Sequence, residues 1–229
     1  MEQNSELLEQ IELFKDIPSE CARKLINGEV DLGLVPIAII PELHQPTIVS
    51  DYCIGAEGKV KSVLLLSDVP FNEIESIYLD YHSRTSVKLC ELLCLKHWNI
   101  APHFLTAEKG FEDKISGSTA GVIIGDRTFH LNKEYAYQYD LAEEWHNMTG
   151  LPFVFAAWVS NKPLPSAFTS TFNAALTHGV SNINEAVKIQ DALSISKSEM
   201  VKYLSQNISY ELNEKKEEAL NLFLSLFSH

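Results

Sequence analysis

The stretch from Ile74 to Lys96 reads IESIYLDYHSRTSVKLCELLCLK, and it joins a strand pattern directly to a helix pattern. Branched and aromatic side chains between residues 74 and 80 predict a strand that ends at Asp80. From Thr85 onward the apolar residues recur with helical spacing and form one broad face, which predicts a helix to Lys96. A strand that passes through a short polar turn into a helix is the repeating unit of α/β proteins.

A second unit of this kind is expected near the start of the chain. Residues 11–14 have a short strand pattern, Pro18 opens a helix that Gly28 ends, and residues 30–35 form an apolar strand pattern. Strand, helix and strand in such close succession predict a βαβ unit with two parallel strands. A further short strand is predicted at 121–125, and further helices are predicted at 142–148, 166–178, 183–189 and 198–228.

Two long apolar patterns, at residues 60–67 and 153–159, are predicted to connect these blocks as crossing strands. We therefore expect an α/β protein with two lobes. The first lobe takes residues 1–67 and 140–229, and the second takes residues 68–139. Ligands of open α/β sheets bind beyond the carboxyl ends of the strands, so the cleft between the lobes is the expected site.

The composition is that of an ordinary folded domain, with 45% hydrophobic and 21% charged residues. The 31 acidic residues outnumber the 18 basic ones, and the formal charge of -13 would repel nucleic acid and anionic membrane surfaces. The start MEQNSELLEQ lacks the regions of a signal peptide, and no apolar run reaches the roughly 18 residues of a membrane span. We therefore expect a cytoplasmic protein that binds a small molecule, without nucleic acid or membrane partners.

Signatures of metal and cofactor sites are missing from the sequence. Its four cysteines include no CxxC pair, and its eight histidines show neither HxH nor HExxH spacing. The chain also has no P-loop, no GxSxG and no GxGxxG motif. The sequence therefore predicts a site without metal and without cofactor.

The strongest candidate for chemistry is the polar turn between the strand at 74–80 and the helix that follows. Ser83, Thr85 and Ser86 occupy the cap and first turn of that helix, where hydroxyls, backbone N–H groups and the helix dipole favour a bound carboxylate. Arg84 would add a bidentate clamp. The alternative is a plain helix cap with a surface arginine, and the local pattern favours neither reading. One cap, however, needs only one hydroxyl.

Two weaker candidates lie at other ends of predicted strands. Gly58 permits close approach of the backbone, and Ser62 is placed to face the cleft, although a plain turn before a strand is the more common structure. Gly125 and Asp126 end the strand at 121–125, where they either face the cleft or simply turn the chain. We include all four as candidate substrate-binding residues.

Several segments, in order along the chain, resemble chorismate dehydratase of the futalosine route to menaquinone. SRTS at 83–86 and TGLPFVFAAW at 149–158 are the most specific of them. The others are DYCIGAEGKVKSV at 51–63, LD at 79–80, IGD at 124–126, and YDL at 139–141 with Trp145.

This resemblance implies a type II periplasmic-binding-protein-like fold used in the cytoplasm. It also implies a lyase that removes water from chorismate to give 3-[(1-carboxyvinyl)oxy]benzoate without a cofactor. Chorismate carries two carboxylates, which suits the hydroxyls of Ser83, Thr85 and Ser86. Formation of an aromatic ring drives the loss of a ring proton and the hydroxyl, but the sequence identifies no catalytic base.

The chain departs from the family pattern at its start. Family members begin with a strand and a YLNT-like segment whose asparagine is thought to act in the chemistry, and no such segment precedes Ser19. We therefore expect that the usual N-terminal strand is missing, which keeps a non-catalytic small-carboxylate binder of the same fold open as an alternative. A third possibility is the sister enzyme of the pathway, which acts on a futalosine-derived nucleoside, but SRTS and TGLPFVFAAW argue against it.

Overall fold

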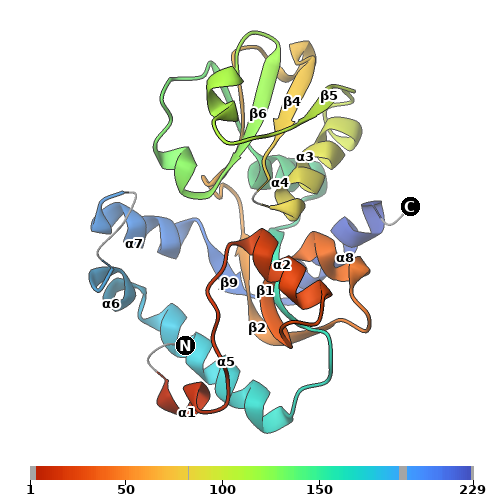
Figure 1. Cartoon of the computed structure of the whole chain (residues 1–229). Helices are drawn as coiled ribbons and strands as arrows, with labels where there is room; N and C mark the ends of the chain where they lie inside the picture. Colours follow the sequence, from red (N-terminus) through yellow and green to blue (C-terminus); the bar gives the residue numbers. More distant parts are fainter. Residues whose placement is uncertain (1–3, 82, 191–194, 228–229) are drawn as a thin grey trace.

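The computed structural model describes residues 4–81, 83–190 and 195–227, which form two lobes, each built on one β-sheet (Figure 1). The sheet of the first lobe is antiparallel throughout, and its strands lie in the order β1 (Leu32–Pro36), β8 (Phe153–Ser160), β2 (Thr47–Ala56) and β9 (Ser209–Glu211). The sheet of the second lobe is mixed, and its strands lie in the order β5 (His103–Thr106), β4 (Ser76–Leu79), β6 (Thr119–Ile124), β3 (Val63–Ser67) and β7 (Tyr137–Asp140).

The chain crosses between the lobes twice. Residues 57–62 lead from β2 to β3, and α4 (Leu141–Thr149) leads from β7 to β8. β3 pairs with β6 and β7, so residues 63–67 belong to the sheet of the second lobe, whereas we expected them in the first. The two crossings lie side by side because the buried carboxylate of Asp140, which caps α4, also accepts a hydrogen bond from the N–H of Lys61 at 2.6 Å.

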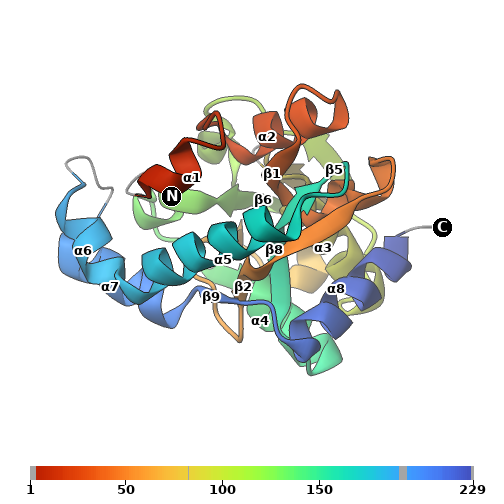
Figure 2. The same cartoon turned by 90° about the horizontal axis from the view of Figure 1, so that it is seen from below.

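Helices cover both sheets. Five of the helices expected from the sequence are present within a few residues of their predicted ends, and the structure places them at 18–26, 84–96, 141–149, 166–181 and 183–188. α5 runs along the first lobe beside β2, where Asn173 accepts hydrogen bonds from Ser50 and Asp51 (Figure 2). Within the described ranges, no helix is long and apolar enough to cross a membrane. The α-helices outside the crossings are α1 (Ser5–Leu8), α2 (Pro18–Ile26), α3 (Arg84–Lys96), α5 (Ser166–Ser181), α6 (Ile183–Lys188), α7 (Lys197–Gln206) and α8 (Glu214–Phe227).

The prediction of a βαβ unit at the start of the chain is wrong. Residues 11–17 form no strand, and β1 pairs with β8 in the antiparallel direction. A strand exists only where a neighbour offers its free backbone groups, and here the apolar side chains of Ile11, Leu13 and Phe14 line a cavity instead.

The prediction of a single long helix at 198–228 is also wrong, because a short strand divides this range into two helices. α7 ends at Gln206, and Ser209–Glu211 then pair with β2 as β9. Asn213 then opens α8 by accepting a hydrogen bond from the N–H of Lys216 at 3.1 Å. Ile208 and Tyr210 favour a strand when a sheet edge is available, which helical periodicity alone does not reveal.

The first lobe and α4 share one apolar core. The rings of Trp145, Phe153 and Phe223 meet edge to face, with centroids 5.1 to 5.9 Å apart, and they join α4, β8 and α8. Lys216 lies buried beside this core, where its Nζ donates to the Ser209 hydroxyl at 2.5 Å and to the Glu211 carbonyl at 2.6 Å. The C-terminal helix is therefore attached to the sheet through both apolar and polar contacts.

We expect Gly55→Ala to lower the free energy of unfolding by about 1–3 kcal/mol. A Cβ atom at Gly55 would lie 2.8 Å from the carbonyl oxygen of Phe153 and 3.3 Å from that of Ser209, so the neighbouring backbones would have to separate. Gly179→Ala in α5 is the matched control, because its Cβ would meet nothing within 4 Å and alanine favours a helix. Urea denaturation should show opposite signs for the two variants, and a fully stable Gly55→Ala protein would contradict this packing.

Candidate functional site

A cavity of about 1760 Å³ is lined mostly by the first lobe, including α5 and α6, and it extends to residues of the second lobe. Its walls include Ile54, Phe155 and Trp158 from the first sheet and Val63 and Ile124 from the second. A volume of this size holds a small ligand together with water, since ligand pockets commonly measure about 300–1,000 Å³. We refer to it as the interlobe cavity.

The start of α3 contributes two hydroxyls to the interlobe cavity, those of Ser83 and Ser86. Ser83 caps the helix by accepting from the N–H of Ser86 at 3.4 Å, and the Ser86 hydroxyl donates to the Ser83 hydroxyl at 3.3 Å. Both hydrogen bonds are long and therefore weak, so a ligand oxygen can replace them at small cost. The structure thus brings together two of the hydroxyls that the sequence singled out, at the positive end of a thirteen-residue helix.

Thr85 and Arg84 are engaged elsewhere. The fully buried Thr85 hydroxyl accepts a hydrogen bond from the N–H of Ala38 at 3.2 Å, and Arg84 forms an ion pair with Glu42 at 2.8 Å on the surface. Ala38 and Glu42 belong to the 3₁₀ helix η1 (Ile37–Glu42) that follows β1, so these two side chains join the lobes. Neither is among the residues that line the cavity, and the site proposed below does not include them.

Ser62 and Gly125 line the cavity beside this helix, and they are joined directly. The N–H of Gly125 donates to the carbonyl of Ser62 at 2.7 Å, which holds the first crossing against the end of β6. Gly125 has a φ of 72°, a conformation that favours glycine. Gly58, with a φ of 148°, and Asp126, which lies in the 3₁₀ helix at 125–129, are not among the residues that line the cavity.

Asp80 holds the ends of two strands of the second lobe together. Its fully buried carboxylate accepts from the N–H of Ile124 at 3.1 Å and forms an ion pair with Arg127, which also pairs with Glu112 at 2.6 Å. The carboxylate therefore ties the end of β4 to the end of β6 and to η4 (Gly125–Phe129). Gly125 begins η4, and Ser83 follows Asp80 by three residues, so this ion pair lies close in the chain to both cavity residues.

Sequence reasoning missed Tyr203, which reaches the interlobe cavity from α7. Its hydroxyl donates to that of Ser62 at 2.8 Å, and its ring packs edge to face on Phe129 with centroids 5.1 Å apart. Burial raises the pKa of Tyr203 above its ordinary value, so the phenol keeps its proton at neutral pH. No local motif surrounds this residue, and only the fold brings it to a segment 141 residues away.

The carboxylate of Asp140 caps α4 and also supports the first crossing. Besides the N–H of Lys61, its carboxylate accepts from the N–H groups of Ala142 and Glu143 at 3.1 and 3.3 Å. Burial raises the pKa of Asp140 above its ordinary value, while these N–H donors act in the opposite direction. The side chain supports the loop that carries Ser62 without lining the cavity itself.

The cationic side chains in the cavity wall are largely engaged with acids. Lys24 pairs with Asp16 and Lys162 pairs with Asp31, both at 2.7 Å. An anion in the cavity would therefore be held mainly by hydroxyl and backbone N–H donors. Among the described residues, no group of three or more histidine, cysteine, aspartate or glutamate side chains is placed to hold a metal ion.

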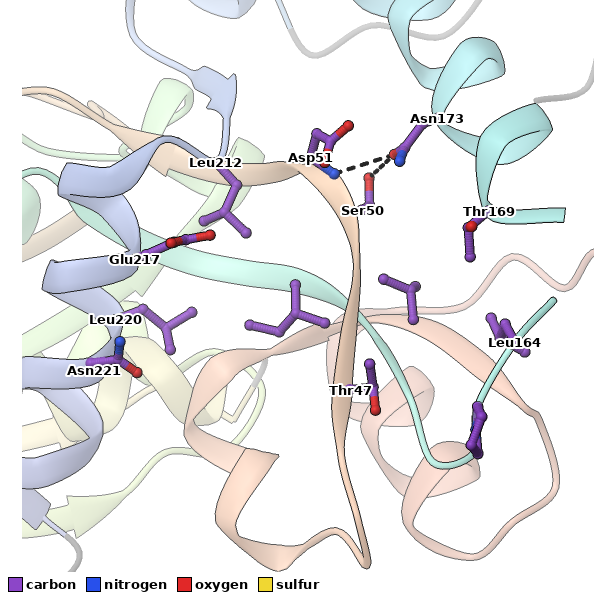
Figure 3. A pocket seen from close by; sticks show the side chains of 13 residues that line it. Thr47, Ser50, Asp51, Leu164, Thr169, Asn173, Leu212, Glu217, Leu220 and Asn221 are labelled. Atoms are coloured by element: carbon purple, nitrogen blue, oxygen red, sulfur yellow. Dashed lines mark hydrogen bonds between the residues drawn. The ribbon is translucent and has the colours of Figure 1, made fainter. Parts of the chain in front are cut away.

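A second hollow, of about 600 Å³, lies on the first lobe between β2, α5 and α8 (Figure 3). Asn173 reaches across it to Ser50 and Asp51, while Glu217 and Leu220 of α8 form its other side. None of the candidate residues from the sequence lines it. The interlobe cavity is therefore the candidate site.

Solved structures with the same fold include protein AF1704 from Archaeoglobus fulgidus, with a TM-score of 0.66 and 14% sequence identity. The alignment covers 93% of this chain and 84% of AF1704. Another is the periplasmic aliphatic sulphonate binding protein SsuA from Escherichia coli, with a TM-score of 0.54, 14% identity, and 93% and 75% covered. The two-lobed α/β fold expected from the sequence, that of periplasmic binding proteins, is thus confirmed.

A curated relative shares more of the sequence. The chorismate dehydratase of Thermus thermophilus is 27% identical over 240 residues, which cover 94% of this chain and 86% of the relative. The model of the protein family described as "Menaquinone biosynthesis" matches residues 4–229, nearly the whole chain. The resemblance seen in the sequence is confirmed, and the chain belongs to this menaquinone biosynthesis family.

Proposed function

We propose that the chain is a lyase that dehydrates chorismate to 3-[(1-carboxyvinyl)oxy]benzoate, and that it does so in the cytoplasm on the futalosine route to menaquinone. The observation that carries the proposal is the pair of hydroxyls of Ser83 and Ser86 at the start of α3, inside the interlobe cavity. Membership of the menaquinone biosynthesis family and the similarity to a chorismate dehydratase over 94% of the chain support it.

The geometry suits a substrate that carries carboxylates. A carboxylate at the start of α3 would accept from the Ser83 and Ser86 hydroxyls and from the first N–H groups of the helix, and the helix dipole would favour its charge. Apolar side chains, among them Ile54, Phe155 and Trp158, also line the cavity and suit the carbon ring. The residues of the cavity thus bind and orient the substrate, and formation of an aromatic ring provides the driving force for loss of water.

The test is direct. The purified protein is incubated with chorismate, and the aromatic product is followed by its ultraviolet absorbance and by chromatography against 3-[(1-carboxyvinyl)oxy]benzoate. We expect conversion that depends on protein concentration and stops when the protein is heat-denatured. Stabilisation of the protein by chorismate without product would instead support the non-catalytic binder of the same fold. Conversion of a futalosine-derived nucleoside, with no effect of chorismate, would favour the sister enzyme.

A further inference from the structure

We propose that Ser62 is a second hydrogen-bond donor to the substrate in the interlobe cavity and that Tyr203 is the positioning residue that aims it. This inference rests on the proposed function, because it assigns a role in holding the same dicarboxylate substrate. We call the two side chains the Ser62–Tyr203 hydroxyl pair.

Among the described residues, no acceptor faces the hydrogen of the Ser62 hydroxyl. A serine hydroxyl donates one hydrogen and accepts at two lone pairs, and here the phenol of Tyr203 donates to it at 2.8 Å. Within the described part of the chain, that phenol is its one hydrogen-bond partner. Ser62 is only 6% exposed and lines the cavity. Buried donors are nearly always satisfied by protein or by water, so this hydrogen is available to a ligand oxygen that enters the cavity.

The position of Tyr203 is set by contacts other than its hydroxyl. The ring packs on Phe129, and the side-chain amide of Asn207, one turn later on the same helix end, donates to the carbonyl of Lys59 at 2.9 Å. α7 is therefore attached to the 57–62 crossing even without the bond to Ser62. Since the backbone of Ser62 is itself held by the N–H of Gly125, both members of the pair are fixed before a ligand arrives.

The direction of the hydrogen bond matters for ligand binding. A hydroxyl that accepts one hydrogen bond becomes a stronger donor in the next, because the two bonds polarise each other in a cavity of low dielectric constant. With one lone pair of Ser62 occupied by the phenol, its hydrogen turns away from Tyr203. Chorismate has two carboxylates, so the hydroxyls of Ser83 and Ser86 serve one of them and Ser62 serves another oxygen of the same molecule.

The experiment compares the wild type with Tyr203→Phe, Ser62→Ala and the double variant, using calorimetric titration with chorismate and with isophthalate, an unreactive aromatic dicarboxylate. We expect each single change to weaken affinity for both ligands by about three- to tenfold, the worth of one net hydrogen bond. The double variant should be no weaker than Ser62→Ala, because Tyr203 acts through Ser62. In Tyr203→Phe the aromatic ring at position 203 can still pack on Phe129, so the variant removes only the hydroxyl.

Asn207→Ala is the control for attachment of α7. It removes a hydrogen bond between α7 and the 57–62 crossing that lies away from the cavity, and it leaves the Ser62–Tyr203 hydroxyl pair in place. Its affinities should stay close to those of the wild type, because the Tyr203 ring still packs on Phe129 and its hydroxyl still donates to Ser62. Equal weakening in Asn207→Ala and Tyr203→Phe, or effects of Tyr203→Phe and Ser62→Ala that multiply, would overturn the inference. If chorismate does not bind but isophthalate binds with the expected pattern across the variants, the proposed function is contradicted and the role of the hydroxyl pair is supported. A wild type that binds neither ligand contradicts both.

Discussion

The Asp80→Ala variant is expected to unfold with a free energy about 3–5 kcal/mol below that of the wild type. The side chain of Asp80 is completely buried, and its carboxylate is shared between the Arg127 guanidinium and the N–H of Ile124. Alanine leaves both donors without this acceptor, and it leaves a small void at the junction of β4, β6 and η4. Breaking one side of a buried, hydrogen-bonded ion pair is among the most costly single substitutions.

Urea denaturation followed by circular dichroism measures this loss, and Asp68→Ala is the matched control. Asp68 pairs with Lys133 at 2.9 Å in the same lobe, but both side chains are about one third exposed or more, so water replaces the lost partner. We expect that control to lose at most about 1 kcal/mol. Similar losses in the two variants would show that burial of Asp80 is not what makes its ion pair important.

The Ser86→Ala variant is expected to bind chorismate about 10- to 100-fold more weakly, with little change in stability. Its hydroxyl lines the cavity, and its one hydrogen bond within the described structure is to the Ser83 hydroxyl, so alanine leaves no protein donor in need of an acceptor. A bound carboxylate, by contrast, would lose a donor at the start of α3 and would turn the Ser83 hydroxyl to a poorer geometry. Isothermal titration and the Michaelis constant of the dehydration both report this loss.

Thr85→Ala provides the contrast within the same turn. Its hydroxyl is the acceptor for the N–H of Ala38 at 3.2 Å, so alanine should lower the free energy of unfolding by about 1–3 kcal/mol. Affinity for chorismate should stay within about twofold of the wild type, since no bond to ligand is lost. If Thr85→Ala binds weakly and Ser86→Ala binds normally, the carboxylate site at the start of α3 has been placed on the wrong hydroxyl.

The local features of the site were predictable from the sequence, and its long-range contacts were not. The cap at Ser83 follows from a hydroxyl at the junction of a strand and a helix, and both elements form as expected. The sequence offers three hydroxyls there without telling them apart. Their roles differ because the N–H of Ala38, 47 residues before Thr85 in the chain, donates a hydrogen bond to the Thr85 hydroxyl. Tyr203 was missed for the same reason, since its partner Ser62 is distant in the chain and close only in the fold.

The errors at the two ends of the chain share one physical cause. Whether a short apolar run becomes a strand depends on a free sheet edge, which local pattern does not report. Residues 11–14 were expected to pair and instead line the cavity, while residues 209–211 were expected to be helical and instead pair with β2. The interiors of long elements such as α3 and β8 were predicted well, because their patterns extend over several turns or alternations.

The order in which the two sheets are completed has a consequence for synthesis on the ribosome. All strands of the second lobe come from one continuous stretch, residues 63–140, whereas β1 and β2 both pair with β8, which is translated more than ninety residues after β2 ends. At a translation rate of about 5–20 residues per second, β8 is therefore synthesised several seconds after β1 and β2, which both pair with it. We expect the second lobe to fold first on the nascent chain, and the unfinished sheet of the first lobe to be the surface that chaperones bind.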